Sequence, residues 1–555
     1  MFQYCGLAKV AGSNKKPSGP SKSDSLACSA RQVMAFVATG FTLLLMTGCN
    51  IPNLRGATLG QGSPADFNGK SSAENSAHMG INEFFGDQVL TQLISDGLAQ
   101  NQELKIRNEE IQVAYNEVTA RRGAYLPFVN IGAGGGVGKT SRFTPLGAAE
   151  DQLFAPKGRR FNHPITDSGL SANLIWQLDI WGQLRNARDA AMTRYCEAIE
   201  QRNYLITKLV AETAENYFEL AALDRRLEYL DQTITLQQKS LDTSKDLKAA
   251  GRGTELAVQR FLAEVRKNES QRLIVKQRII EVENRINFLV GRYPQPVDRK
   301  AWNFIKLDAR VLNVGLPSQL LQNRRDIVVA ERELAAAGLD VEVARANFYP
   351  KVAITAGVGF ESFNPRFLFD PGALFANTAG QLVAPLINKL AIQAEYQSAN
   401  ARQLQAVYNY QRTVLNAFTE VVNNVSKVEN YRSSVTIKLE QVKALEEYVG
   451  VATDLFQAGR KQDVEYMDVL FAQRDLLEAR TVLIETKQQQ LTAIVTAYQA
   501  LGGGLLMDPD SSFYSETSEP LDNPEEAMPI DQPAENALPE PQPDDPANNA
   551  PNDAP

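Results

Sequence analysis

Two stretches of this chain are too long, and too free of helix-breaking residues, to belong to an ordinary globular domain. Between Gly182 and Ala250 there is neither proline nor glycine, and between Lys389 and Ala458 there is only Gly450. Proline removes a backbone donor and glycine costs conformational entropy, so their absence favours uninterrupted helix. At about 1.5 Å per residue, each helix would be roughly 100 Å long. The chain must therefore fold into an elongated architecture.

Four shorter helical segments flank the two long ones. In the first half of the chain they lie near Gln88–Arg122 and Thr254–Leu289, and in the second half near Pro317–Asn347 and Gln462–Leu501. In each half, the two short segments together are about as long as one long helix. We therefore predict two short helices stacked end to end beside each long helix, which makes an antiparallel bundle of constant height.

The long segments carry apolar repeats typical of coiled coils. Leucines and isoleucines follow steps of three and four in the first segment, and valines recur every seven residues in the second. These positions are Leu220, Leu223, Leu227, Leu230, Ile234 and Leu241, then Val428, Val435, Val442 and Val449 with Leu445 between them. The other faces are rich in Gln, Asn, Lys and Glu, so they meet water or a polar partner. A scaffold rod without a pore is the alternative interpretation.

Three landmarks recur in the same order along the chain. Tyr125-Leu126-Pro127 returns as Phe348-Tyr349-Pro350, Ala250-Gly251-Arg252 as Ala458-Gly459-Arg460, and Leu289-Val290-Gly291 as Ala500-Leu501-Gly502. A fixed order of recurrence is the signature of internal duplication. The chain is therefore predicted to be two copies of one unit, and each copy is expected to read helix, strand, strand, long helix, tight turn and helix.

The segments after the Pro landmarks alternate with a period of two, which predicts strands. The expected strands cover about 128–138 and 170–180 in the first copy, and 351–361 and 378–387 in the second. One face carries Val129, Ile131, Leu170, Leu174, Val352, Ile354 and Phe360, and the other carries Asn130, Gly132, Ser171, Asn173, Thr355, Gly357 and Gly359. A soluble sandwich would explain the two faces, and so would a lipid-facing band around a wet lumen.

The N-terminus carries an export signal. Val33–Met46 is an apolar run preceded by basic residues, which is typical of a signal peptide and too short to span a membrane. It ends in Met46-Thr47-Gly48-Cys49, which resembles a bacterial lipobox, in which the cysteine becomes acylated after cleavage. We therefore expect a lipid anchor on Cys49. An ordinary cleaved signal with a chance cysteine is the alternative.

The residue inventory argues against an enzyme, a metal site or a cofactor. His78 and His163 lie far apart in the sequence, and no cysteine is near either of them. Cys5 and Cys28 would leave with the signal, so Cys196 would have no partner for a disulfide. The body of the chain is nearly neutral and has no concentrated basic face, which excludes a nucleic-acid partner. The last residues, from Met507, hold 13 acids and no Lys or Arg, so we expect a disordered acidic tail.

Four strands cannot close a barrel within one chain, and an open sheet edge cannot lie in lipid. Eight strands are the usual minimum for a closed barrel. If the strands lie in a membrane, the chain must therefore form an oligomer. Three copies would supply twelve strands, which is enough for an open lumen.

At this point the sequence resembles a known family. The duplicated unit, the paired Pro landmarks, the Ala-Gly-Arg turns and the closing Ala500-Leu501-Gly502-Gly503-Gly504 are similar to those of the outer-membrane efflux proteins (TolC-like). Two further stretches are also similar, namely Asp468-Val469-Leu470-Phe471-Ala472-Gln473-Arg474 and Glu485-Thr486-Lys487-Gln488-Gln489-Gln490-Leu491. The resemblance covers about residues 83–506. The lipobox suggests the lipoprotein branch that serves resistance–nodulation–division pumps.

The resemblance implies a homotrimer in the outer membrane of a Gram-negative-type bacterium, extending into the periplasm. It also implies two partners, an inner-membrane pump and a periplasmic adaptor (membrane fusion) protein, which meets the tunnel tip at the turns of Gly251, Arg252, Gly459 and Arg460. The candidate gate at the tip consists of Lys461, Asp463, Glu465 and Asp468. Phe471 stands where the family often has the second acid of an Asp-Val-Leu-Asp run, and solvated charges at a helix start are the alternative.

The expected fold class is α+β: a trimeric twelve-stranded β-barrel, four strands per chain, continued by a long antiparallel coiled-coil tunnel. The expected function is a passive exit duct for drugs, toxic compounds or metal ions, without catalysis. A duct of type I protein secretion and a lipid-anchored structural coiled coil are the alternatives. The expected domains are a signal peptide (1–48), an anchor linker (49–82), a first repeat (83–291), an inter-repeat segment (292–316), a second repeat (317–506) and the acidic tail (507–555).

Overall fold

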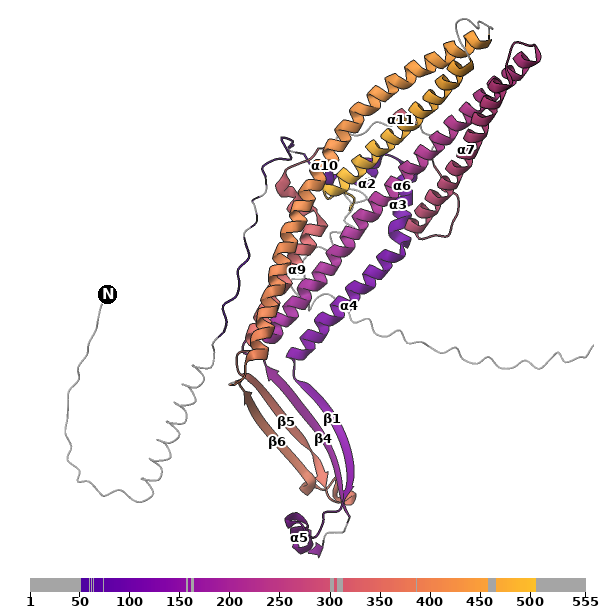
Figure 1. Ribbon diagram of the computed structural model, residues 1–555. Coiled ribbons are helices and arrows are strands. Elements are labelled where there is room, and N and C mark those ends of the chain that lie inside the picture. Colours follow the sequence, from indigo (N-terminus) through magenta and orange to yellow (C-terminus); the bar gives the residue numbers. More distant parts are fainter. Residues whose placement is uncertain are drawn as a thin grey trace, which may run out of the picture.

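The computed structural model describes residues 51–505, apart from gaps at 59, 61, 63, 73, 156–157, 161–163, 300–303, 307–312, 386 and 458–465. The molecule is a long rod with its strands at one end and the far ends of its long helices at the other (Figure 1). The predicted elongated architecture is confirmed. No helix in the described part of the chain is long and apolar enough to cross a membrane.

Four antiparallel strands form one sheet in the order β1-β4-β5-β6. They are β1 (Phe128–Gly138), β4 (Ile165–Leu178), β5 (Lys351–Ser362) and β6 (Leu374–Val383). The predicted range 378–387 for the last strand is wrong at both ends. The strand starts earlier and stops before Pro385, which has no backbone N–H to donate to a neighbouring strand.

The register of the sheet confirms the two predicted faces. Asn130 pairs with Asn173, Asn173 with Gly357, and Gly357 with Asn377, so one polar row crosses all four strands. A Cβ atom at Gly357 would lie 2.6 Å from Oδ1 of Asn377 and 3.0 Å from Oδ1 of Asn173. The two amides therefore lie closer to Gly357 than a side chain at that position would allow.

The excursion between β1 and β4 lies at the end of the sheet that points away from the helices (Figure 1). It contains α5 (Pro145–Gln152) and a short hairpin of β2 (Phe154–Ala155) and β3 (Arg159–Arg160). Thr144 caps α5 by accepting a hydrogen bond from the backbone N–H of Gly147. The connection between β5 and β6 holds the 3₁₀ turns η4 (Pro365–Phe367) and η5 (Pro371–Ala373).

The two long helices are α6 (Gln183–Ala249) and α10 (Leu390–Gln457), with 67 and 68 residues. Each turns back into a shorter antiparallel partner, α7 (Glu255–Val290) after α6 and α11 (Tyr466–Ala500) after α10. The lengths predicted from the absence of helix breakers are confirmed. Val435, Val442 and Val449 are buried in one cluster between α10 and α11, as the heptad pattern predicts.

The segments predicted as single helices at Gln88–Arg122 and Pro317–Asn347 are each broken once. The first consists of α3 (Gln88–Gln100) and α4 (Gln102–Tyr125), and the second of η3 (Pro317–Gln319), α8 (Leu320–Asn323) and α9 (Arg325–Ala346). Asn101 breaks the first segment because its backbone is non-helical while its side chain caps the next helix at the N–H of Leu104. Arg324 breaks the second segment with an extended backbone.

Each break holds the end of another helix. Asn101 Nδ2 donates to the carbonyl of Leu289 near the end of α7 at 2.8 Å, and Arg324 donates to the carbonyl of Ala500 at the end of α11 at 3.1 Å. The helices α4 and α7 therefore stack end to end beside α6, as predicted, and α9 and α11 repeat the arrangement. Gly291 and Gly502, both with positive φ, let the stacked ends approach closely.

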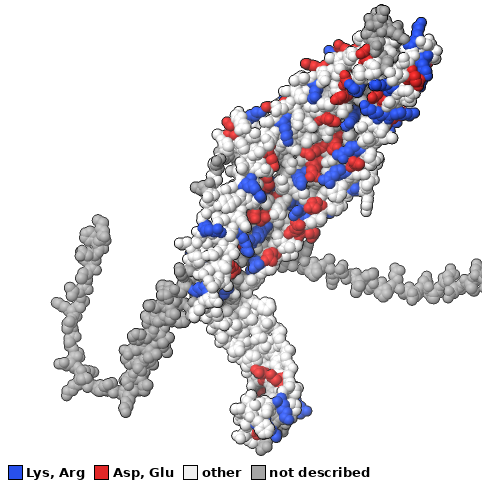
Figure 2. Space-filling view, in the orientation of Figure 1, with Lys and Arg blue, Asp and Glu red and all other residues white. Residues whose placement is uncertain are grey.

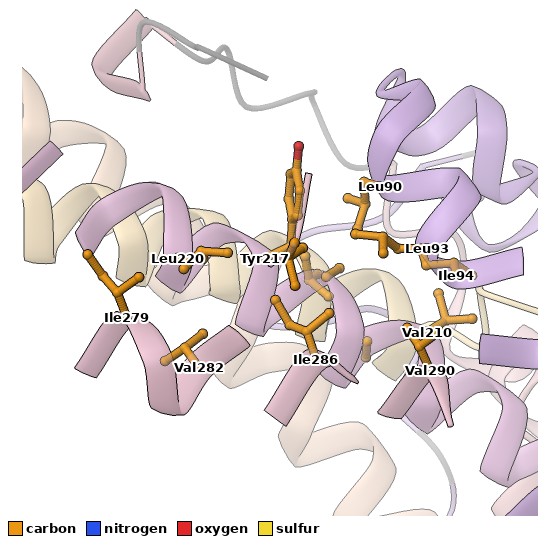
Figure 3. Packing of buried hydrophobic residues seen from close by; sticks show 14 of the residues in the cluster. Leu90, Leu93, Ile94, Val210, Tyr217, Leu220, Ile279, Val282, Ile286 and Val290 are labelled. Carbon is orange, nitrogen blue, oxygen red and sulfur yellow. The ribbon is translucent and has the colours of Figure 1, made fainter. Parts of the chain in front are cut away.

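The largest apolar cluster joins α2 (Ile81–Phe85) and α3 to α6, α7 and the start of the inter-repeat segment. Figure 3 shows Leu90, Leu93 and Ile94 of α3 facing Val210 of α6 and Val290 of α7. Two smaller elements, η1 (Ser76–His78) and η2 (Phe304–Lys306), contribute Ala77 and Phe304 to neighbouring apolar clusters that include the end of α11. The core thus sits at mid-length, where both stacked junctions lie.

Candidate functional site

The predicted anchor linker is a packed segment that follows one face of α10. Ile51 packs with Tyr396, and the backbone of Arg55 exchanges two hydrogen bonds with the amide of Asn400 at 3.0 and 3.2 Å. Further along, Phe67 is buried and stacks on Phe418 with ring centroids 5.4 Å apart. We call residues 51–72 the strap. It connects the strand end of the helices with the mid-length core.

The opposite face of α10 is hollowed. Successive hollows lie between α6, α9 and α10, and the last also reaches α11. On α10 they are lined by Arg402, Gln405, Asn409, Arg412, Asn416, Glu420, Asn424, Lys427 and Tyr431, at helical steps of mostly three and four. Strap contacts and hollow residues therefore occupy opposite sides of the helix. We call this hollowed side the wall face.

The wall face is polar along its length. The hollow at mid-length has a volume of about 650 Å³ and a lining that is mostly polar. On α11 that lining consists of Glu485, Gln488, Gln489, Thr492, Thr496 and Gln499, together with Ala493 and Ala500. Figure 2 shows charged side chains over the helical part and few over most of the sheet. A polar surface of this length suits a water-filled passage more than a binding pocket for one apolar ligand.

A buried ionic cluster closes the mid-length hollow toward the core. Arg324 is only 5% exposed and binds Asp326 at 2.6 Å and Glu420 at 2.8 Å, in addition to the carbonyl of Ala500. Burial works against the charged form of Arg324, but hydrogen bonding and attraction from both carboxylates outweigh it and raise its pKa. The cluster ties α9, α10 and α11 together at one point.

The predicted tip residues Gly251 and Arg252 lie in the turn between α6 and α7. Gly251 has φ +69° and its N–H donates to Lys248, while the N–H of Arg252 donates to Leu247. These two bonds are a Schellman motif, which favours glycine at this position. Gly253 is equally constrained, since a Cβ there would lie 2.8 Å from the backbone nitrogen of Lys248.

The other predicted site residues are mostly outside the described part of the chain. Cys49, Gly459, Arg460, Lys461, Asp463 and Glu465 all fall there. Asp468 is half-buried in the first turn of α11, and Phe471 follows one turn later with Arg474 over its ring at 5.0 Å. The turn between α6 and α7 and the start of α11 both lie at the end of the rod farthest from the sheet (Figure 1).

Sequence reasoning missed Arg324 and the strap. Arg324 and Asn101 are 223 residues apart, the same separation as between Pro350 and Pro127, so aligning the two repeats would have paired them. The strap gives a weaker signal, because Phe67 is an isolated aromatic residue in a Gly-, Ser- and Asn-rich stretch. In the described residues no cluster of His, Cys, Asp and Glu has the geometry to hold a metal ion.

One acid of α6 should make stability depend on pH. Burial, with repulsion from Glu212, raises the pKa of Glu215 to about 7. Between about pH 4.5 and 7, Glu215 keeps its proton in the folded state but loses it in the unfolded state. The free energy of unfolding therefore falls as the pH rises through this range. We expect Glu215→Gln to raise the thermal midpoint at pH 8 and to flatten this dependence. Exposed Glu109→Gln is the control, and equal slopes in both variants would contradict the prediction.

Comparison with known proteins shows which sequences this chain is similar to. The family model described as Outer membrane efflux protein matches residues 93–292 and 316–503. The chain is 26% identical over 434 residues to the cation efflux system protein CusC of Escherichia coli strain K12, covering 78% of this chain and 91% of CusC. It is 26% identical over 474 residues to the solvent efflux pump outer membrane protein SrpC of Pseudomonas putida, covering 84% of this chain and 97% of SrpC.

The fold is also that of solved channels. The structure of the open state of the MtrE outer membrane channel of Neisseria gonorrhoeae superposes with a TM-score of 0.70 at 21% identity. The superposition covers 83% of this chain and 99% of that one. The predicted fold class is confirmed, because the chain, with its four-stranded sheet and long antiparallel helices, superposes on nearly all of that channel.

Proposed function

Because the chain belongs to the outer membrane efflux protein family, whose model matches both of its repeats, we propose that it is the exit duct of a tripartite efflux system. It is accordingly an efflux channel of the bacterial outer membrane. In the proposed system an inner-membrane pump supplies energy and cargo, and a periplasmic adaptor joins that pump to the duct. The observation that carries the proposal is the polar wall face, which lies opposite the strap and continues toward the sheet.

The wall face is the inner surface of the proposed duct. If Cys49 carries the lipid, the strap, which begins two residues later, and the side of α10 that it covers face outward. The hollows then face inward, where a water column needs polar walls. The sheet supports the same assignment, since its row of Asn130, Asn173 and Asn377 gives one face amide groups while the other face is apolar.

We infer that three copies close the duct. β1 and β6 are the two edge strands of the sheet, and an edge in lipid needs a partner strand. On the helical part, Leu415 of α10 is 67% exposed at one side, and Val113 of α4 is equally exposed at the other. Head-to-tail contacts between copies would bury both sides and close a ring of twelve strands.

The lipid anchor fits the position of the strap. Ile51 packs beside Phe348 and Tyr396, at the place where helices meet strands. At the same level Trp181 stacks on Tyr349, with ring centroids 4.7 Å apart. Tryptophan and tyrosine side chains favour the membrane–water interface. Two residues of extended chain span only about 7 Å, so an acylated Cys49 would enter the membrane at this level. The lipobox supplies the chemistry for that acylation.

The adaptor is proposed to bind at the helical tip. The Schellman turn of Gly251 and Arg252 fixes the end of the α6–α7 hairpin without a long loop. The repeat predicts the same turn at Gly459 and Arg460, followed by the proposed gate of Lys461, Asp463, Glu465 and Asp468. A rigid hairpin end presents the same surface in all three copies, which suits a partner arranged around the duct.

Conductance in a planar lipid bilayer tests the proposed duct. We expect the purified mature protein to give discrete current steps as a trimer. The variant Cys49→Ala should conduct in the same way but should not incorporate a labelled fatty acid. The two measurements thus test the channel and the lipid anchor independently. A mature protein that stays monomeric and dissolved without detergent, and passes no ions, would refute the proposal.

A further inference from the structure

Two hollows of the wall face each expose a cation without an ion pair. Arg412 lines the middle hollow and Lys427 the hollow at mid-length. Both side chains are exposed, and neither forms an ion pair with any residue that the structure describes. Arg412 donates a hydrogen bond to the amide of Asn409 at 2.6 Å, which leaves its charge uncompensated.

The acids in the same two hollows are already paired. Asp326 and Glu420 bind the buried Arg324, and Glu485 lies 3.4 Å from Arg226. The other cations of these hollows are compensated as well, since Arg107 binds Glu110 at 2.6 Å, Lys208 lies 3.8 Å from Glu212, and Arg325 lies 3.3 Å from Glu200. The charged groups of these hollows that have no ion pair with a described residue are therefore Arg412 and Lys427, while Arg324 offsets only one of the two carboxylates that it binds.

The hollow nearest the strands does not continue this pattern. Arg402 lines it together with Glu197 and Glu333, neither of which has an ion pair with Arg402 or any other described residue. Two unpaired carboxylates therefore face one unpaired cation there, and burial, with the charge of Glu333, raises the pKa of Glu197. Arg412 and Lys427 are thus the cations of the wall face whose own hollows hold no unpaired acid among the described residues.

The neutral lining of the mid-length hollow suits a ligand that makes hydrogen bonds. Around Lys427 it offers hydroxyl and amide groups of Asn424, Tyr431, Gln488, Gln489, Thr492 and Thr496. The volume of about 650 Å³ is within the range of small-molecule sites. None of the residues that line the two hollows is Met, His or Cys, so the hollows lack the ligands that soft metal ions prefer.

We propose that Arg412 and Lys427 form a track along the duct for anionic small molecules, those that carry carboxylate, phosphate or sulfonate groups. The proposal rests on the duct function and names a class of cargo for it. The two residues are 15 positions apart on α10, which is about 22 Å. In a trimer they become two rings of three cations, and walls of low dielectric strengthen such fields on passing ions.

Block of the single-channel current by an anionic probe tests the track. The probe is 8-hydroxypyrene-1,3,6-trisulfonate, and the organic trication spermidine is compared with it. In the variant Arg412→Gln/Lys427→Gln we expect the half-blocking concentration of the trisulfonate to rise about tenfold, while spermidine blocks no less strongly than before. Lys427→Gln alone should give a smaller rise, and it serves as the readout if the double variant does not form trimers.

The matched control is Lys443→Gln on the same helix. Lys443 is exposed and lies two heptads after Glu429, whose carboxylate pairs with Lys70 of the strap, so it belongs to the strap side. This variant should leave the block unchanged. An unchanged block in both wall variants would overturn the track while the conductance upheld the duct. Absence of any conductance in the unaltered protein would overturn the duct and the track together.

Discussion

Replacement of Arg324 by alanine is expected to lower the free energy of unfolding by about 3 kcal/mol, the low end of the cost of breaking a buried ion pair. Arg324 is 5% exposed, and Asp326 is 19% exposed beside it. Without the guanidinium, Asp326 keeps a charge that little water can solvate, and the carbonyl of Ala500 loses its donor. Glu420 is more exposed and contributes less, which is why the expected loss stays at the low end.

Arg325→Ala is the matched control for this prediction. Arg325 is the next residue along the chain, but it is 29% exposed and makes one ion pair, at 3.3 Å to Glu200. Partly exposed pairs contribute about 1 kcal/mol or less, so this variant should lose little. Urea unfolding of the trimer in detergent, followed by helix content at one fixed protein concentration, measures both variants. Equal losses for the two would show that the cluster has no special role.

Replacement of Leu415 by glutamate is expected to abolish the trimer. Leu415 is 67% exposed in one chain, on the flank of α10 that would meet the next copy. Each of three contacts would then bury a carboxylate without a partner, at a cost of several kcal/mol per contact. Because the ring closes only when all three contacts form, the penalties act together.

Mobility in gel electrophoresis with and without heating, together with native mass spectrometry, reads out the assembly. Leu415→Met is the control, because it keeps an apolar side chain of similar volume and should leave the trimer intact. A heat-sensitive trimer that persists with glutamate at this position would place the contact between copies elsewhere. Loss of the trimer in both variants would point to misfolding of α10 instead.

The long helices, the strand faces and the turns could be predicted because each depends on local sequence. Absence of helix breakers gives α6 and α10, and alternation gives the faces that the pairing of Asn130 with Asn173 confirms. The breaks at Asn101 and Arg324 could not be seen in this way. Both residues are tolerated in helices, and both leave the helix because they hold the end of another helix far away in sequence.

The functional surface was harder to predict than the fold. The heptads predict which side of α10 packs on α11, but not which remaining side meets the strap and which faces the hollows. That distinction depends on contacts such as Arg55 with Asn400 and Phe67 with Phe418. Lys427 likewise has no ion pair within the described part of the chain because the nearby acids Glu420 and Glu485 bind Arg324 and Arg226 instead. Those pairs join residues that lie far apart in the chain.

The strap also constrains the order in which the molecule can be built. Arg55 and its partner Asn400 are 345 residues apart, and Thr58 and Gln411 are 353 residues apart. The strap therefore has nowhere to dock until nearly the whole polypeptide has been exported, and contacts of such long range form slowly. If Cys49 is acylated first, the rest of the protein must fold while already tethered to a lipid surface.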